Sequence, residues 1–381
     1  MTANGLRTSE PGSRLSSLVD DDALLAAMLR YEAALARAAA DCGLAPRAAA
    51  DAIGRVCERL AEDRQAARQS FDSLAPAGPA PAGEAAGAAF VRRLTELVAA
   101  EDTNAARFVH FGSSNADLLD SATMLVSRAA ARELDAMLAE LGDALAALAD
   151  RHRDTLLGAA AAAQAASPVS FGWKAAGWLD QIARSRRLLE RTVDEQAALQ
   201  FGGVDGALAD MGEAAPQLTR ALADGLWLPV ASISWHGARD RIARIGAELA
   251  MVCGAAVRIG HELPQSSRAG SDAAPALAAA CKAPGLAGTL LSDLAPGHEP
   301  ATGPDDTRPD PARVLRELFE AAGTAVDAIH AALDGLQVDE APIQASAPDR
   351  SAAKAQLLIG ATAMLDAVLD DWHAQRSETT A

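Results

Sequence analysis

Apolar side chains recur at helical spacing along most of the chain, and the clearest example lies between residues 117 and 150. There, leucine and methionine form a continuous stripe at intervals of three or four residues: Leu134, Met137, Leu138, Leu141, Leu145 and Leu148. This is the spacing of one face of an α-helix. Because no proline or glycine occurs between residues 113 and 141, the pattern predicts a helix of more than about 30 residues, roughly 45–50 Å long.

The same periodicity predicts further helices, separated by short breaks. They span residues 20–44, 46–62, 88–101, 168–198, 237–263, 272–294, 311–337 and 350–374. Stretches rich in proline and glycine, 74–89 and 296–311, interrupt the series, and the polar residues 1–19 are expected to form a flexible lead. Long helices joined by short turns indicate an all-α, elongated bundle, with a small N-terminal helical part and a truncated C-terminal piece.

Composition favours helix and narrows the possible partners. Half of the 381 residues are hydrophobic and 3% are aromatic, and the dominant alanine and leucine lose little side-chain freedom in a helix. The formal net charge of −17 argues against a nucleic-acid partner, because a phosphate footprint needs clustered Lys and Arg. A small anionic ligand remains possible. Its cations would be mostly arginines, since the only lysines are Lys174, Lys282 and Lys354.

Cysteine usage and the absence of long apolar runs suggest a compartment. The four cysteines (Cys42, Cys57, Cys253 and Cys281) form no CxxC pair and have no histidine at metal spacing. This pattern favours free thiols in a reducing cytoplasm and predicts neither a metal nor another cofactor. With no charged-then-apolar leader and no apolar run near the ~20 residues of a membrane span, we expect a cytoplasmic protein without a membrane partner.

Polar side chains gather just before the longest predicted helix. The segment "HFGSSNADLLD", residues 110–120, places Ser113, Ser114 and Asn115 there. The N–H groups and positive dipole end of a helix N-terminus bind anions. Ser, Asn and Asp are also the preferred N-cap residues. The segment alone fits either interpretation and favours the cap.

Two more segments carry polar groups beside small residues. In "QAASPVSFGWKAAGW", residues 164–178, Gln164 and Ser170 flank Pro168, a pattern that also fits a polar helix start. In "QFGGVDGALADMG", residues 200–212, the glycines predict a tight turn between helices. It lacks the preceding strand of a dinucleotide-binding fingerprint.

The remaining candidate segments carry histidine, arginine and serine. "SWHGARDRIARIG", residues 234–246, places His236, Arg239 and Arg241 near a helix start, where they form either a site or a solvated face. The loop within residues 261–277 offers Ser266 and Ser267. A serine acts as a nucleophile or base only where its surroundings activate the hydroxyl.

The order of these segments is more specific than any one of them. "RFVHFGSSNADLLDSA", "QAASPVSFGWKAAGW", "LQFGGVDGALADMG" and "SWHGARDRIARIG" resemble successive blocks of the fumarase/aspartase superfamily. The most similar branch is that of the 3-carboxy-cis,cis-muconate cycloisomerases, whose blocks read LQFGGAAGTLA and WHTQRDR at the last two places. The resemblance runs from about residue 19 to about residue 300.

The resemblance implies a fold and an assembly. It implies an all-helical subunit whose central bundle forms a homotetramer, with each active site built from three subunits. The implied division is an N-terminal helical domain at 1–109, a central bundle that carries oligomerisation and the active site at 110–337, and a reduced C-terminal helical segment at 338–381.

It also implies a set of substrate-binding residues. Ser113, Ser114 and Asn115 match positions that grip substrate carboxylates, and His110 and Asp117 fall in the same block. Gln164 matches the glutamine of the family's RTxLQxAxPxTFG pattern, Ser170 stands in place of its threonine, and Arg239 and Asp240 match the RD pair. The implied pocket comprises His110, Ser113, Ser114, Asn115, Asp117, Gln164, Ser170, His236, Arg239, Asp240 and Arg241.

The chain departs from the superfamily at two functional places. The mobile signature loop reads GSSxMPxKxNP and carries the proposed catalytic serine, whereas this chain has the shorter "PQSSRAGSDAAP" there and no K-x-N anywhere. Ser266 and Ser267 are the catalytic candidates that remain. In the second block, Ala160 and Ala161 replace an Arg-Thr pair, and each charge-assisted bond to a carboxylate contributes about 1.5–3 kcal/mol.

Three functions follow as hypotheses. The first is an enzyme of the cycloisomerase type in aromatic catabolism (the protocatechuate/β-ketoadipate pathway), closing a muconate tricarboxylate to a γ-lactone without a cofactor. The second is a catalytically degenerate homologue that acts as an oligomer partner or ligand binder, as the missing loop and the alanines suggest. The third is a lyase acting on another succinate-type substrate.

Overall fold

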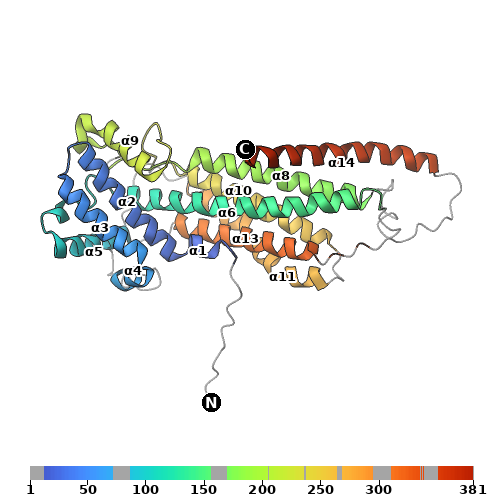
Figure 1. Ribbon diagram of the computed structural model, residues 1–381, viewed down its shortest axis with the longest axis horizontal. Helices are drawn as coiled ribbons and strands as arrows, with labels where there is room; N and C mark the ends of the chain where they lie inside the picture. Colours follow the sequence, from blue (N-terminus) through green and yellow to red (C-terminus); the bar gives the residue numbers. More distant parts are fainter. Residues whose placement is uncertain are drawn as a thin grey trace, which may run out of the picture. The chain divides into compact units, whose positions relative to one another are not determined.

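The computed structural model describes most of the chain, with several gaps. The described residues are 13–71, 86–155, 170–204, 206–235, 237–263, 268–294, 310–334, 336, 338 and 351–380. Within them, regular structure is helical apart from isolated β-bridge residues such as Leu199 and Val230 (Figure 1). The predicted all-α fold is confirmed.

The chain divides into two compact units, each assembled from three stretches of sequence. Unit 1 contains Met1–Arg132, Arg191–Ala247 and Gly285–Glu320, and unit 2 contains Glu133–Glu190, Glu248–Pro284 and Ala321–Ala381. The boundaries fall inside helices. The predicted domain limits after residues 109 and 337 stay a prediction.

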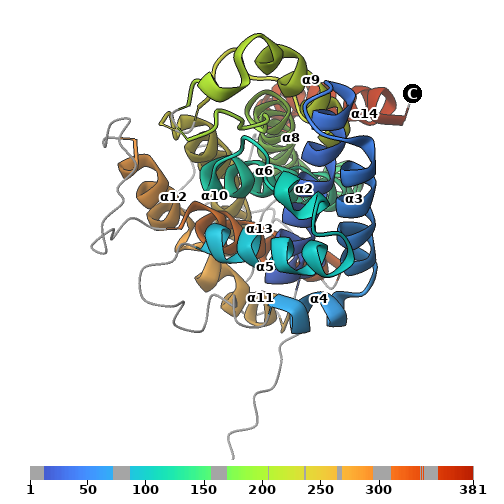
Figure 2. The same cartoon turned by 90° about the vertical axis from the view of Figure 1, so that its left-hand side faces the viewer.

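Unit 1 contains the N-terminal helices and a later short pair. They are α1 (Ser16–Val19), α2 (Asp21–Asp41), α3 (Arg47–Glu62), α4 (Arg64–Phe71), α5 (Ala86–Glu101), the 3-10 turns η2 (Ala105–Phe108) and η3 (Ala209–Ala214), and α9 (Ala215–Leu226). Helices α2 and α3 lie side by side in both views (Figures 1 and 2). Asp20 caps α2, accepting a hydrogen bond of 2.8 Å from the N–H of Ala23.

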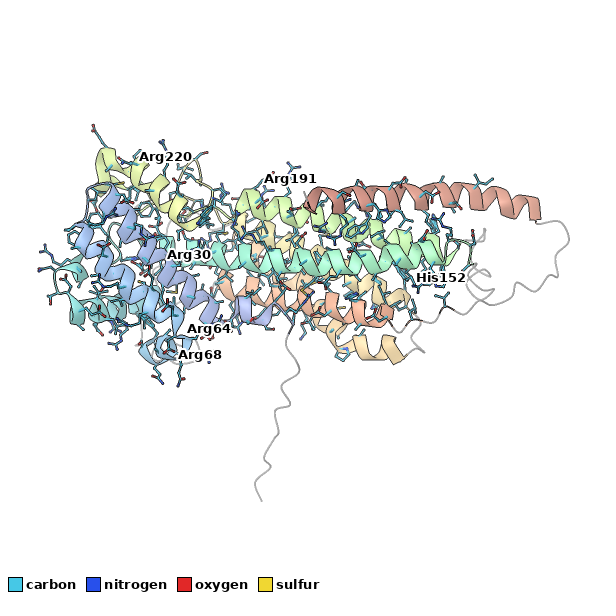
Figure 3. The ribbon with its side chains drawn as sticks, in the orientation of Figure 1. Arg30, Arg64, Arg68, His152, Arg191 and Arg220 are labelled. Carbon is cyan, nitrogen blue, oxygen red and sulfur yellow. The ribbon has the colours of Figure 1, made fainter. Side chains whose placement is uncertain are left out.

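Arginines tie the outer helices of unit 1 to α2. Arg68 of α4 forms an ion pair with Asp22 and thereby lowers the pKa of that carboxyl. Arg30 of α2 donates to the carbonyl of Leu226, which ends α9, over 3.1 Å. Arg30 and Arg68 are labelled in Figure 3. These contacts hold α2 in place as the helix that supplies Tyr31 and Glu32 to the candidate site.

The long helices follow the predicted stripes. They are α6 (Asn115–Arg151), α8 (Phe171–Gln196), α10 (Asp240–Glu262) and α13 (Pro311–Asp334), and α14 (Ser351–Thr380) is the last. Leu134, Leu138, Leu141 and Leu145 of α6 are fully buried. The hydrophobic stripe in the sequence is therefore the core face of α6.

Three expectations about helices are wrong. The predicted helix 272–294 is two helices, α11 (Arg268–Ala280) and α12 (Ala283–Ser292). Pro284 is the second residue of α12, a first-turn position where its missing N–H costs no helical hydrogen bond. The expected flexible lead contains α1, anchored by Leu15 and Val19 at 0% and 4% exposure. Helices α4 and α9 were not predicted; α9 buries Leu218, Leu222 and Leu226.

One stretch of the described residues, Ala273–Ser292, has the length and mean hydropathy (1.2) of a membrane span, and 28% of it is buried. This corrects the expectation that no apolar run approaches ~20 residues. The stretch covers parts of two helices, which Cys281 and Lys282 separate. Core helices of soluble proteins satisfy the same criteria, so the evidence for a membrane span is weak.

In unit 2, Trp372 joins α14 to α6. Its indole is 1% exposed and lies over Gly142, where an added Cβ would come 2.2 Å from the ring. The indole N–H donates to Asp143 over 2.9 Å, and the guanidinium of Arg186 lies 5.9 Å from the ring centroid. A glycine on one helix and the largest side chain on the other therefore form one packing unit.

Trp372→Ala is expected to lower the free energy of unfolding by about 3–5 kcal/mol, because it leaves a cavity over Gly142 that backbone alone cannot fill. Urea denaturation measures this loss. Trp173→Ala is the control, since Trp173 is 40% exposed, and its cost should be under about 1 kcal/mol. Equal costs for the two variants would show that Trp372 is not a packing anchor.

Candidate functional site

The N-terminus of α6 is a reciprocal capping box formed by Ser114 and Asp117. The hydroxyl of Ser114 accepts from the N–H of Asp117 over 3.2 Å, and Oδ2 of Asp117 accepts from the N–H of Ser114 over 2.8 Å. This pairing satisfies two of the N–H groups that a helix start leaves unpaired. The cap interpretation of this segment therefore holds for these two residues.

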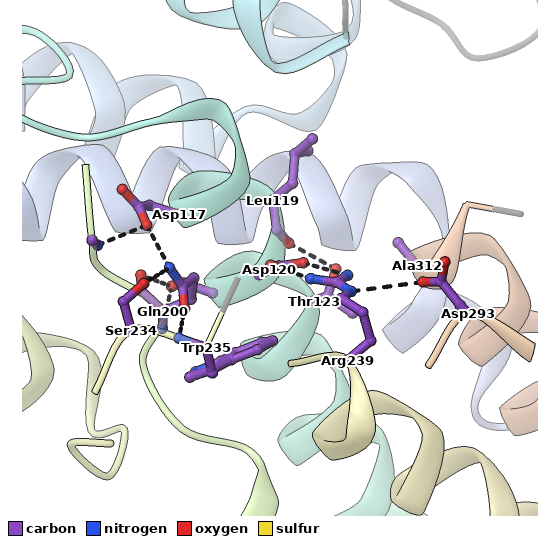
Figure 4. Close-up of polar contacts among 12 residues, drawn as sticks. Asp117, Leu119, Asp120, Thr123, Gln200, Ser234, Trp235, Arg239, Asp293 and Ala312 are labelled. Carbon is purple, nitrogen blue, oxygen red and sulfur yellow. Dashed lines mark hydrogen bonds and ion pairs between the residues drawn. The ribbon is translucent and has the colours of Figure 1, made fainter. Parts of the chain in front are cut away.

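The carboxylate of Asp117 also binds the glycine turn that starts at Gln200. Its Oδ1 accepts from Nε2 of Gln200 over 2.8 Å and from the N–H of Gly202 over 2.9 Å, and its Oδ2 accepts from the N–H of Gly203 over 2.9 Å. With the bond from Ser114, this fully buried carboxylate receives four N–H donors. Asp117 thus holds the turn against the start of α6 (Figure 4).

Gln200 extends this connection to the segment that precedes α10. Its Nε2 donates to the hydroxyl of Ser234 over 2.8 Å, and its Oε1 accepts from the N–H of Trp235 over 2.7 Å. Gln200 is fully buried, and an added Cβ on Gly202 would come 2.3 Å from Oγ of Ser234. One glutamine therefore joins three blocks that are distant in the sequence. It was not among the predicted site residues, although it lies inside the quoted "LQFGG".

Arg239 forms an ion pair inside unit 1. Its two Nη atoms donate to the carboxylate of Asp120 over 2.6 and 2.9 Å, and its Nε lies 3.8 Å from Asp293. The guanidinium also lies 5.9 Å from the ring of Trp235. Planar pairing of this kind fixes an arginine firmly. Arg239 therefore positions α10 against α6 in this chain (Figure 4).

The neighbours of Arg239 make local contacts at the start of α10. Asp240 is the first residue of the helix and pairs with Arg244 over 3.4 Å. Arg241 donates to the backbone carbonyl of Glu195 over 3.1 Å. The Asp240–Arg244 pair lies within α10, whereas the Arg241 contact attaches the start of α10 to the end of α8.

Helix α2 supplies two buried partners to the turn before α6. The hydroxyls of Tyr31 and Ser113 are hydrogen-bonded over 2.8 Å. Glu32 binds His110 twice, accepting from the backbone N–H over 2.9 Å and pairing with ring Nδ1 over 2.6 Å. Burial, then the charge of Asp117, raises the pKa of Tyr31, so it is a neutral hydroxyl at the site.

The chain matches a model of a known protein family. A family model described as Lyase matches residues 8–268. The chain belongs to this lyase family of the fumarase/aspartase superfamily.

Individual superfamily members are similar over most of the chain. The 3-carboxy-cis,cis-muconate cycloisomerase of Bradyrhizobium diazoefficiens is 35% identical over 351 residues, which cover 86% of this chain and 75% of that protein. The nitrosuccinate lyase of Streptomyces davaonensis is 38% identical over 267 residues, covering 68% of this chain and 54% of that protein. The crystal structure of 3-carboxy-cis,cis-muconate lactonizing enzyme from Pseudomonas putida aligns with a TM-score of 0.75 at 30% identity, covering 86% of this chain and 75% of that one.

The site residues predicted from the superfamily resemblance fall into three groups: those in unit 1, one in unit 2 and those outside the described residues. Unit 1 brings His110, Ser113, Ser114, Asn115 and Asp117 together at the start of α6, and Arg239, Asp240 and Arg241 lie at the start of α10. Ser170 is in unit 2, where its hydroxyl caps α8 by accepting from the N–H of Trp173 over 3.1 Å. Gln164, His236, Ser266 and Ser267 lie outside the described residues. The roles assigned to all of these residues in substrate binding or catalysis stay predictions.

Unit 2 has a charge cluster around Glu262, the last residue of α10. Its Oε2 accepts from the indole N–H of Trp178 over 3.0 Å and lies 3.5 Å from Nζ of Lys174, and Arg258 donates to Oε1 over 3.1 Å. Burial opposes ionisation of Glu262, but these donors and cations outweigh it and lower its pKa. The cluster joins α8 to the end of α10.

Asp117→Asn is expected to lower the free energy of unfolding by about 2–4 kcal/mol, because either amide orientation turns an NH₂ group toward two N–H donors. Urea denaturation provides the measurement. Asp240→Asn, which alters only an exposed pair with Arg244, should cost under about 0.5 kcal/mol. A cost for Asp117→Asn as small as that of the control would contradict the positioning role.

Glu262→Gln is expected to cost about 1 kcal/mol at pH 7, with a characteristic pH dependence. Since folding lowers the pKa of Glu262 from 4.5, its charge stabilises the fold above pH 4.5, and this contribution is lost as the pH falls through the lower, folded value. The stability difference from the unmodified chain should therefore shrink below about pH 4.5. Glu317→Gln, in the exposed pair with Arg313, is the control, and an equal pH dependence in both variants would contradict the assignment.

Proposed function

We propose that this chain is a cycloisomerase of the 3-carboxy-cis,cis-muconate type, closing a conjugated tricarboxylate to a γ-lactone. The observation that carries the proposal is the 35% identity to a cycloisomerase of that name over 86% of the chain. The structural alignment to the Pseudomonas putida lactonizing enzyme supports it. The physiological setting that we propose is aromatic catabolism in the cytoplasm.

The reaction needs donors for carboxylates and one group that moves a proton. A substrate carboxylate oxygen adds to one carbon of a C=C bond, and a proton is delivered to the neighbouring carbon. Negative charge on the adjacent carboxyl grows on the way and is stabilised by donors already in place. The amide of Asn115, beside the positive end of the α6 dipole, is suited to this task, and the hydroxyl of Ser113 could join it only by exchanging its hydrogen bond with Tyr31.

The contacts of Asp117 and Arg239 suit a structural role, in which these residues position the site and do not bind the substrate. Their charges are already balanced inside unit 1 by four N–H donors and by the Asp120 carboxylate respectively. We propose that they hold the start of α6, the glycine turn and the start of α10 in fixed relative positions. Substrate cations would then come from other residues, and we propose, as the family resemblance implies, a homotetramer whose active sites are shared between subunits.

A cleft in unit 2 is a poor alternative site for a polycarboxylate. It has a volume of about 710 Å³ and lies along α6 and α14. Four aspartates line it: Asp143, Asp150, Asp366 and Asp370. Arg153 also lines the cleft and pairs with Asp150 and Asp366, but the aspartates outnumber it. Their excess negative charge would repel an anionic substrate, and this favours the start of α6 as the binding region.

A lyase reaction on a succinate derivative is the second candidate. The 38% identity to the Streptomyces davaonensis nitrosuccinate lyase favours it, over a shorter alignment. The two reactions share a proton transfer next to a carboxyl group and differ in the bond that forms or breaks. Ala160 and Ala161, in place of an Arg-Thr pair, favour instead a catalytically degenerate homologue that binds a ligand without turnover.

The test is to incubate the pure protein with 3-carboxy-cis,cis-muconate and, separately, with nitrosuccinate. Ring closure should remove the ultraviolet absorbance of the conjugated diene, and we expect turnover of this substrate. Turnover of nitrosuccinate alone would replace the proposal with the lyase reaction. No turnover of either at high protein concentration would overturn both enzymatic proposals.

Asn115→Ala should raise KM about 10-fold, the effect of losing one hydrogen bond to a carboxylate worth about 1.5 kcal/mol, with little change in stability. Its matched control is Asn104→Ala, the same change at an exposed position of unit 1. Steady-state kinetics and thermal denaturation provide the two readouts. If KM is the same in the two variants, Asn115 does not contact the substrate.

A further inference from the structure

Glu32 and His110 form a buried acid–base pair that connects α2 to the turn before α6. The side chain of Glu32 is 1% exposed and that of His110 is 12% exposed. Both carboxylate oxygens are used on the same residue, one by the backbone N–H and one by ring Nδ1. This double contact fixes the ring as well as the backbone.

The contacts determine which ring nitrogen can do chemistry. An ionised carboxylate only accepts hydrogen bonds, so Nδ1 carries the hydrogen that faces Glu32. Nε2 is buried and has no hydrogen-bond partner among the described residues. Buried polar atoms are nearly always paired, and an exception calls for an explanation.

The backbone adds a second departure from ordinary structure. His110 has φ of 58°, a left-handed conformation that costs a non-glycine residue of order 1 kcal/mol or more. Asn or Gly would be less strained there. The turn thus keeps a histidine, in a strained conformation, with one nitrogen unused.

Several titratable groups lie around the pair. Among them, Glu32 is the one that would balance the charge of a protonated His110 ring. From α2, Tyr31 is a neutral hydroxyl bound to Ser113. From α3, Cys57 is buried, and burial followed by the charge of Glu32 raises the pKa of its thiol, so it is neutral too. Asp117 on α6 is bound to four N–H donors, and Arg107 in η2 is exposed.

We propose that Nε2 of His110 is the proton carrier of the reaction proposed above, with Glu32 as its counter-ion. This inference rests on the proposed function and assigns to the pair the proton transfer that the superfamily gives to its loop serine. As the substrate's carboxylate oxygen forms the C–O bond, the C=C electron pair takes the proton from Nε2–H of the imidazolium. The ring is left neutral, and a proton from water restores it. In the lyase direction, the Nε2 lone pair removes the proton next to the carboxyl group.

The segment around η3 lies against this turn through Met211, and movement of that segment would give a substrate access to the turn. The Met211 side chain lies against Gly112, with its methyl carbon 2.1 Å from the place of an added Cβ. Among the residues of η3, none is buried, and Gly212 interrupts its helical geometry. A cover with so few buried contacts opens at low cost.

His110→Asn is the decisive variant. Asparagine tolerates the left-handed backbone and can still donate its amide N–H to Glu32, so the variant removes Nε2 and keeps the turn. We expect kcat to fall by about 10²–10⁴-fold, the usual effect of losing a general acid or base. The thermal midpoint should stay close to that of the unmodified chain. The affinity for tricarballylate, measured by calorimetry, should stay within twofold of that of the unmodified chain.

Two further variants separate a proton carrier from a structural residue. Glu32→Gln removes the counter-charge of the proposed proton carrier, so the pH–rate profile of this variant should differ from that of the unmodified chain. His373→Asn, at an exposed position of α14, is the matched control and should keep full activity. A structural role alone would lower stability in His110→Asn and leave the pH–rate profile of Glu32→Gln unmoved.

The outcomes distinguish this inference from the proposed function. If the unmodified chain turns over substrate and His110→Asn does so equally well, the proton-carrier role is wrong and the cycloisomerase proposal stands. If the unmodified chain turns over neither substrate, the proposed function fails, and the proton-carrier role fails with it. If His110→Asn is slow but also loses tricarballylate affinity 10-fold or more, the histidine binds substrate instead of carrying its proton.

Discussion

The geometry at the start of α6 depends on a single carboxylate, that of Asp117. A buried charge is costly unless donors surround it, and here four N–H groups from two sequence segments do so. Each donor alone contributes little, but the carboxylate has no second arrangement that would satisfy it as well. The glycine turn and the start of α6 are therefore held in one relative position. Through Gln200, the segment before α10 is held with them.

The fold follows closely from the sequence because α-helices are encoded locally. Leu134 to Leu148 repeat at helical spacing, and every long predicted stripe is a helix in the structure except where Pro284 divides one. The capping box also follows from neighbours in the sequence, since Ser114 and Asp117 are three residues apart. Short elements such as α1 and α9 are harder to predict, because a few buried apolar residues and not a long stripe hold them in place.

The site follows less closely, because its contacts join distant residues. The amide of Gln200 contacts Asp117, 83 positions away, and the guanidinium of Arg239 contacts Asp120, 119 positions away. From the sequence, Arg239 matches a substrate-binding position of the superfamily, and nothing nearby reveals its internal partner. Likewise, no local pattern links His110 to Glu32. Family resemblance locates the site, and only tertiary structure shows which of its charges are already neutralised.

The contact between Gly142 and Trp372 has a consequence for how this chain can vary. Any side chain at position 142 would occupy the space of the indole ring, so a larger residue there is compatible only with a smaller one at position 372. The reverse change also needs its partner, since a smaller residue at 372 leaves a void unless position 142 gains volume. Two positions far apart in the chain should therefore change together among related sequences, and a relative that has lost one of the pair should have lost both.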